Sequence, residues 1–168
     1  MSRSTSFFAS LLFLVTVGCG SSQTSSVGQP VVVDPAAAAG TQVGIVISPD
    51  DATVSTYFIS ESNDPVVALK ALQDSGASLV TDTTGLQLCS INGVGHPQVP
   101  CLGTGSDPFW GFFVRNVEGG WTFSDVGVAS YFVKDGDVLG FAWTGIDFNT
   151  FQPLRTPPSF TLTEIAAR

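Results

Sequence analysis

Charged residues are scarce in this sequence, and basic residues are the scarcest of them. Only 12% of the 168 residues are charged, and 6 Lys and Arg stand against 14 Asp and Glu, for a formal net charge of −8. No two basic residues lie close together in the chain, which argues against the basic face that phosphate binding requires. We therefore expect no nucleic-acid partner. Because 43% of the residues are hydrophobic, the composition also differs from that of a disordered acidic segment.

Histidine is scarcer still, since His96 is the one histidine of the chain. A single histidine without cysteine or carboxylate neighbours specifies no metal site. We interpret it as a loop imidazole, solvated or bonded to a carbonyl; the alternative is an axial ligand to a corrinoid cobalt or a haem iron. Serine and threonine are plentiful but lack a base within reach, and no pair stands out among the scattered acids. We predict no enzyme and no metal site.

Residues 1–18 are typical of a targeting segment. Arg3 supplies a short positive region, and the apolar run at residues 7–17 is shorter than the roughly 20 residues that a membrane span requires. The run ends in VTVGC, which resembles a bacterial lipoprotein signal peptide with Cys19 as the acylated first residue of the mature chain. That family has an aliphatic residue three positions before the cysteine, where this chain has Thr16. The alternative is an ordinary secretory signal with a coincidental cysteine.

The lipoprotein interpretation predicts a protein of the cell envelope, held on a membrane by the lipid on Cys19. Because Gly20 rather than aspartate follows, we expect the outer membrane if the host has two. Of the three cysteines, lipidation of Cys19 leaves Cys89 and Cys101. Export to an oxidising compartment predicts a disulfide between them. The alternative, a metal held by cysteine, finds no further ligand nearby except His96.

Residues 19–40 are rich in Ser, Gly, Ala and Pro, which predicts a flexible linker ahead of a domain at residues 41–168. Val31, Val32 and Val33 are the exception within it, as a stretch able to add a strand to a sheet.

Hydrophobic alternation and turn residues predict an early hairpin at residues 42–48 and 53–60. A short helix is predicted to begin with Asp64 as N-cap and Pro65 at its first position, and to end at Gly76. Further strands are expected at residues 78–82, 87–92, 109–114, 121–123 and 138–143. We predict a loop at residues 93–107. The proline-rich tail at residues 144–168 is expected to wrap the surface as coil, with a short strand at residues 160–162.

One short helix packed on a mixed sheet is an α+β arrangement. Residues 52–145 contain, in order, VVALKAL, CSINGVG, FWGFFV, GGWTFSDVGVASY and KDGDVLGFAW. This set resembles the transcobalamin-like domain, the β-grasp module at the C-terminal end of cobalamin carriers, and the tail PLRTPPSFTLTEI resembles the ends of its bacterial members. The resemblance implies a β-grasp fold, a non-catalytic binding role and a pairing of Cys89 with Cys101. It makes cobalamin or a related corrinoid the candidate ligand, although the larger domain that completes the carrier site is absent here.

Aromatic residues supply the candidate binding site. Trp110 and Phe112 are predicted to share one face of their strand, and we expect Trp121 and Trp143 on neighbouring strands. The residues we assign to a ligand are Trp110, Trp121 and Tyr131, with His96 as a further candidate for a metal-bearing ligand. The alternative is that these aromatics are core and that the C-terminal tail covers the second face of the sheet.

We therefore predict an envelope-anchored, non-catalytic binding module for a small ligand, with corrinoids as the candidate class. The alternative function is a structural or adhesion module that docks on another envelope protein. A concave pocket beside Trp110, Trp121 or Trp143 would favour the ligand, and a flat exposed edge would favour docking.

Overall fold

The computed structural model describes residues 40–61 and 65–168 of the chain. The predicted signal peptide, Cys19 and the linker up to residue 39 lie outside the described residues, so these predictions remain predictions. Within the described part, no helix is both long enough and apolar enough to cross a membrane.

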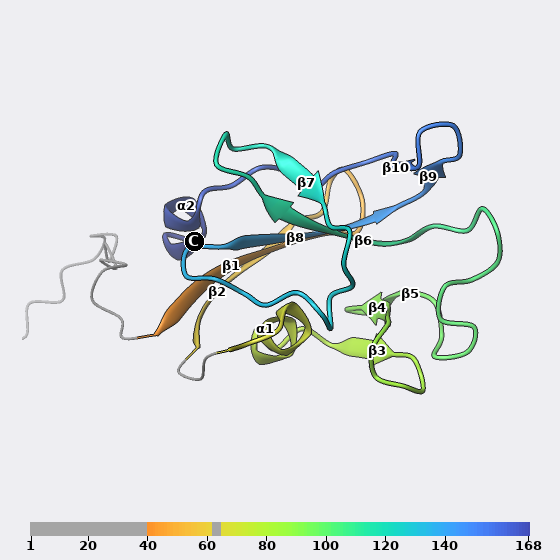
Figure 1. Ribbon diagram of the computed structural model, residues 1–168, viewed down its shortest axis with the longest axis horizontal. Helices are drawn as coiled ribbons and strands as arrows, with labels where there is room; N and C mark the ends of the chain where they lie inside the picture. The colour runs from red at the N-terminus through yellow and green to blue at the C-terminus, as the bar shows by residue number, and fades with distance from the viewer. Residues whose placement is uncertain (1–39, 62–64) are drawn as a thin grey trace, which may run out of the picture.

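The centre of the domain is a five-stranded mixed sheet with the strand order β2-β1-β8-β6-β7 (Figure 1). Its strands are β1 (Thr41–Ser48), β2 (Ser55–Glu61), β6 (Phe109–Arg115), β7 (Trp121–Phe123) and β8 (Val138–Thr144). The predicted hairpin is confirmed, because β1 pairs antiparallel with β2. On its other side β1 pairs parallel with β8, which in turn pairs antiparallel with β6. The fold class is therefore mixed α+β with mostly sheet, as the sequence predicted.

Helix α1 (Ala68–Asp74) packs on one face of this sheet through Leu69 and Leu72, in one cluster with Ile45, Phe112 and Phe141. The helix begins later than predicted. Its N-cap is Val67, in extended conformation and without a side-chain cap.

The helix begins late because the residues before it are paired through their backbone with another segment. Val133 N–H donates to Val66 O, and Val67 forms a bridge with Phe132. This pairing keeps the chain extended, so the predicted start at Pro65 is wrong; Asp64 lies outside the described residues. At the other end Gly76, with φ +81°, follows the C-cap Ser75 and ends the helix as predicted.

A second, three-stranded sheet follows α1, in the order β3-β4-β5. Its strands are β3 (Leu79–Thr81), β4 (Leu88–Ile91) and β5 (Val94–Gly95). The first two confirm predicted strands, whereas β5 lies inside the stretch predicted as loop. The predicted disulfide is present: Cys89 and Cys101 are bonded, with their Cα atoms 4.7 Å apart.

The C-terminal tail is more ordered than predicted. It forms β9 (Ile146–Asp147), β10 (Gln152–Pro153) and a second helix, α2 (Leu162–Ala166). The strand predicted at residues 160–162 is wrong, because Thr161 caps a helix there: its hydroxyl accepts from Glu164 N–H, and the Glu164 carboxylate accepts from Thr161 N–H. Helix α2 buries Ile165 against Val46 and Val138, so the tail covers the sheet face opposite α1.

Candidate functional site

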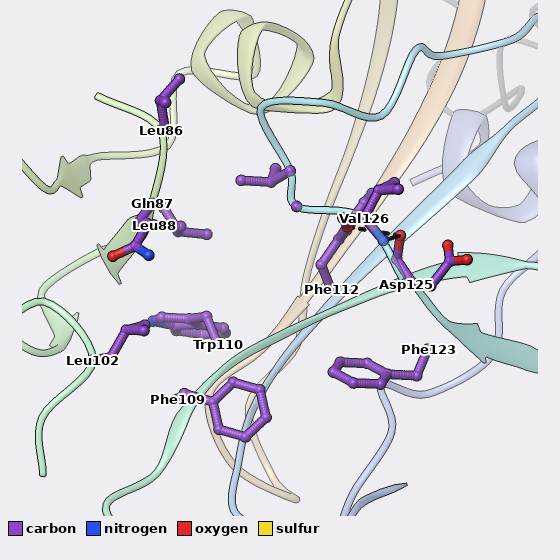
Figure 2. A pocket seen from close by; sticks show the side chains of 13 residues that line it. Leu86, Gln87, Leu88, Leu102, Phe109, Trp110, Phe112, Phe123, Asp125 and Val126 are labelled. Atoms are coloured by element: carbon purple, nitrogen blue, oxygen red, sulfur yellow. Dashed lines mark hydrogen bonds between the residues drawn. The ribbon is translucent and has the colours of Figure 1, made fainter. Parts of the chain in front are cut away.

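An apolar groove of about 260 Å³ lies between the first half of β6 and the loop that joins β3 to β4 (Figure 2). Leu86 and Leu88 stand on one side of it, and Phe112 and Val126 on the other. Trp110 lies between these two sides, and Phe109 and Phe123 line the groove from the other side of β6. The groove therefore joins residues from segments that are far apart in the sequence.

The β3–β4 loop, which carries Leu86 on one side of the groove, is held in place by a carboxylate. Asp82 accepts hydrogen bonds from the Thr84 hydroxyl (2.6 Å) and from the backbone N–H groups of Leu86 (2.9 Å) and Gln87 (3.0 Å). These bonds, with that of Thr84 the strongest, lower the pKa of Asp82 to about 2. The loop that carries Leu86 is thus fixed by a group that stays ionised at all ordinary pH values.

The disulfide ties two lining residues together. Cys89 directly follows Leu88, and Cys101 directly precedes Leu102, which also lines the groove. The bond thereby holds the 101–102 segment beside β4. Without it, this part of the wall would depend on a long loop with few apolar contacts.

Trp110 is oriented by contacts on two sides. Its Nε1 donates to Val94 O at 2.9 Å, and its ring lies 5.7 Å from the ring of Trp143. Because the indole nitrogen is already bonded, the ring offers the groove an apolar surface. Across β6 from Trp110, Phe109 and Phe123 form an edge-to-face pair with their ring centroids 6.3 Å apart.

The edge of β6 beside the groove carries free backbone groups. Asn116 N–H donates to Gly120 O and Ser124 N–H donates to Phe112 O, both at 2.9 Å, so the even-numbered residues of β6 direct their backbone groups away from β8. Trp110 is also an even-numbered residue of β6, so its backbone groups point away from β8 as well. Strand β7 ends before it reaches Trp110. Its N–H and C=O therefore face the open edge, and neither has a hydrogen-bond partner in the described part of the chain.

The groove carries negative charge and no positive charge. Asp125 is its one charged lining residue, and the remaining polar groups come from Gln87 and Ser124. The Asp125 side chain is exposed, so its carboxylate is free to interact with a charged group on a ligand. The arrangement favours neutral or cationic ligands over anions.

Two of the four residues assigned to a ligand by sequence lie close together, and one of them lines the groove. Trp110 is that lining residue, although it is only 7% exposed and also belongs to the core cluster on the α1 face. His96 packs against Trp143 with ring centroids 5.2 Å apart and bonds Pro108 O through Nε2 at 2.8 Å. The carbonyl bond is the one expected of a loop imidazole. The Trp143 ring thus contacts the rings of both Trp110 and His96, but only Trp110 lines the groove.

The other two lie elsewhere. Tyr131 packs edge-on against Phe112 and donates its hydroxyl proton to Asp137 at 3.0 Å. Burial, together with the negative charge of Asp137, raises the pKa of Tyr131 to about 12. Trp121 lies on the opposite face of the sheet, packed against Phe113.

Trp121 and Trp143 lie on the two strands that neighbour β6, as expected: Trp121 on β7 and Trp143 on β8. Strand β6 lies between β7 and β8, and the two indoles belong to different sides of the sheet. The sequence shows that both strands are apolar but not their order, since order depends on long-range pairing.

Sequence reasoning missed most of the groove. Leu86, Leu102 and Val126 were not singled out, although they are exposed by 61%, 54% and 43%. Isolated apolar residues in loops carry no signal on their own. The one available hint was that Leu88 and Leu102 flank the two cysteines of the predicted disulfide.

The groove by itself does not enclose a corrinoid. Pockets for drug-sized molecules measure about 300–1,000 Å³, and the groove, at about 260 Å³, is smaller than a site for the much larger corrin ring would be. His96 is packed between Trp143 and Gly103 and does not line the groove. Among the described residues, no three His, Cys, Asp or Glu side chains gather as metal ligands.

Comparison of the chain with protein-family models, with curated proteins and with solved structures gave no match.

Proposed function

We propose that the domain is a non-catalytic binding module whose ligand places an apolar group in the groove beside Trp110. The observation that carries the proposal is the convergence of exposed apolar side chains on one concave site. Leu86, Leu102 and Val126 are all more than 40% exposed and all line the same groove. Single exposed apolar residues are ordinary, but a concave apolar cluster is typical of a binding site. The apolar group belongs to a small molecule or to a side chain of another envelope protein.

The proposal includes a location and a family. A lipid anchor on Cys19 in the cell envelope is supported by the apolar run that ends in Gly18 and Cys19. A transcobalamin-like β-grasp domain is supported by the ordered sequence motifs and by a mixed sheet that begins with a hairpin and carries α1 on one face. The anchor is tested by Cys19→Ser, which should move the protein from the membrane to the soluble fraction. A Cys19→Ser protein that stays with the membrane would show that lipidation is not the anchor.

The groove is tested with a neutral apolar fluorophore, N-phenylnaphthylamine, whose emission rises in an apolar site. Leu102→Asp should weaken binding about tenfold, or about 1.4 kcal/mol, because it places a carboxylate at the apolar rim. Since Leu102 is exposed, the free energy of unfolding should change by less than about 0.5 kcal/mol.

Val117→Asp is the matched control. Val117 is fully exposed in the turn between β6 and β7 and does not line the groove, so the variant adds the same charge at a distant site. It should bind the fluorophore as the wild type does. If the wild type gives no rise in emission, or if Leu102→Asp binds equally well, the groove is not a binding site.

A further inference from the structure

We propose that the ligand of this groove is an extended peptide segment of a partner protein, which adds as a strand to the open edge of β6 and carries a basic residue beside its apolar side chains. This inference rests on the proposed function, because it names the ligand class of the same groove. It draws on three observations: free backbone groups, apolar surface on both faces of the edge, and charge.

The backbone groups of Trp110 provide the first step. Its N–H and C=O point to the same side of β6 at the place where β7 no longer covers the edge. A donor and an acceptor in this arrangement match one residue of an antiparallel partner strand. Peptide recognition by strand addition uses such groups for affinity and neighbouring pockets for specificity.

The groove also supplies surface for side chains on both faces of an added strand. Successive side chains of an extended peptide point to opposite faces. On one face they would meet Phe112 and Leu88, and on the other Phe109 and Phe123, which lie on the opposite side of β6 from Trp110. An extended segment with apolar residues at neighbouring positions therefore finds apolar contacts on both sides.

Charge favours a basic segment from another protein. Asp125 is exposed at the rim, no basic residue lines the groove, and the chain as a whole has a net charge of −8. The protein's own stretch of Val31, Val32 and Val33 is followed by Asp34 and has no basic neighbour. It would bring a like charge toward Asp125, so a partner segment fits better than this stretch of the same chain.

Short peptides with blocked ends, in which two neighbouring valines are flanked by threonines, are the probe. One series carries a lysine and its matched series a glutamate at the same place. At low ionic strength the lysine peptide should bind the full chain carrying Cys19→Ser at least about tenfold more tightly than the glutamate peptide. Asp125→Lys should reverse that order. Glu118→Lys makes the same charge change at an exposed position outside the groove and should leave the order as it is.

The backbone pairing has its own measurement. Hydrogen exchange of the Trp110 amide should slow at least about tenfold when the lysine peptide binds. The Gly111 amide, which faces β8 in the existing ladder, is the internal control and should not change. N-methylation of the peptide residue that pairs with Trp110 should abolish binding, and N-methylation of the next residue should not.

The outcomes separate this inference from the proposed function. If the fluorophore binds but no peptide binds or displaces it, strand addition is wrong and a small-molecule site remains. Peptide binding without protection of Trp110 would show that the edge of β6 is not used. If changing Val31, Val32 and Val33 together to serine exposes a Trp110 amide that was protected in the free protein, the groove holds the chain's own segment, and the partner peptide is overturned. If neither fluorophore nor peptide binds, the proposed function itself fails.

Discussion

The two faces of the central sheet are closed in different ways, although the same strands supply both. On the α1 side, large residues of β1, β6 and β8 meet Leu69 and Leu72, and the packing leaves an open groove beside Trp110. On the α2 side, the strands carry glycines where the tail crosses them (Figure 1).

Two of these glycines show why the second face is closed. A Cβ on Gly44 would lie 2.7 Å from Ile165 Cδ1, and a Cβ on Gly140 would lie 2.7 Å from the Trp121 ring and 2.9 Å from Pro157. Missing side chains therefore make room for the tail. The tail is therefore an integral layer of the fold, whereas the groove face keeps apolar surface available.

The largest expected effect concerns the groove side. Replacing Cys89 and Cys101 together by serine should lower the free energy of unfolding by about 3 kcal/mol, because the disulfide no longer restricts the unfolded chain. Fluorophore binding should fall as well, since Leu88 and Leu102 lose their connection. Chemical denaturation and fluorophore titration measure the two effects. Unchanged binding in the folded double variant would show that the bond does not shape the groove.

The next effect concerns the closed side. Ile165→Ala should cost about 2 kcal/mol, at the low end for a buried isoleucine because α2 lies at the chain end and can relax. Fluorophore binding should stay as in the wild type, because Ile165 packs on the opposite face. Thermal melting together with titration checks both parts. Loss of binding in a folded Ile165→Ala protein would show that the two faces are coupled.

A somewhat smaller loss of stability is expected when the contacts of Arg155, which fasten the tail to the sheet, are removed. The Arg155 guanidinium donates to Ser48 O at 2.9 Å, Trp143 O at 3.0 Å and Asp50 O at 2.6 Å. Arg155→Ala should cost about 1.5 kcal/mol, as for hydrogen bonds made by a charged group. Arg155→Lys keeps the charge but loses the planar fork, so it should recover only part of this stability in urea unfolding. Full recovery by lysine would mean that charge alone holds the tail.

The smallest effect is a pH dependence of the groove wall. Because the pKa of Asp82 is lowered to about 2, its contribution is fully present above the unfolded value near 3.8 and is lost as the pH falls through about 2. The amide signals of Leu86 and Gln87, followed by NMR, should therefore shift with a midpoint near pH 2. In the Asp82→Asn variant, these amide signals should show no such transition. A midpoint near 4 in the wild type would show that the carboxylate does not hold the loop.

Much of the local structure was predictable from the residues alone. Alternation of Val43, Ile45 and Ile47 predicts a strand with these three side chains on one face, because side chains alternate along extended backbone. All three are buried, and Val46 on the other face is buried as well. The pairing of Cys89 with Cys101 followed from cysteine count and compartment. Helix α2 was missed, although Thr161 and Glu164 form a capping box, because the prolines before it favoured coil.

The candidate site was decided by the tertiary structure. Trp110 and Trp121 are equally aromatic in sequence, yet one faces the groove and the other lies under the tail, because strand order and register place them on different sides of the sheet. The open edge at Trp110 exists because β7 ends at Phe123, and the wall opposite exists because Asp82 and the disulfide hold separate loops nearby. A sequence determines which residues prefer burial and which backbone turns are favourable, since those are local properties. Which apolar residues remain uncovered depends on long-range pairing, and only the folded chain decides that.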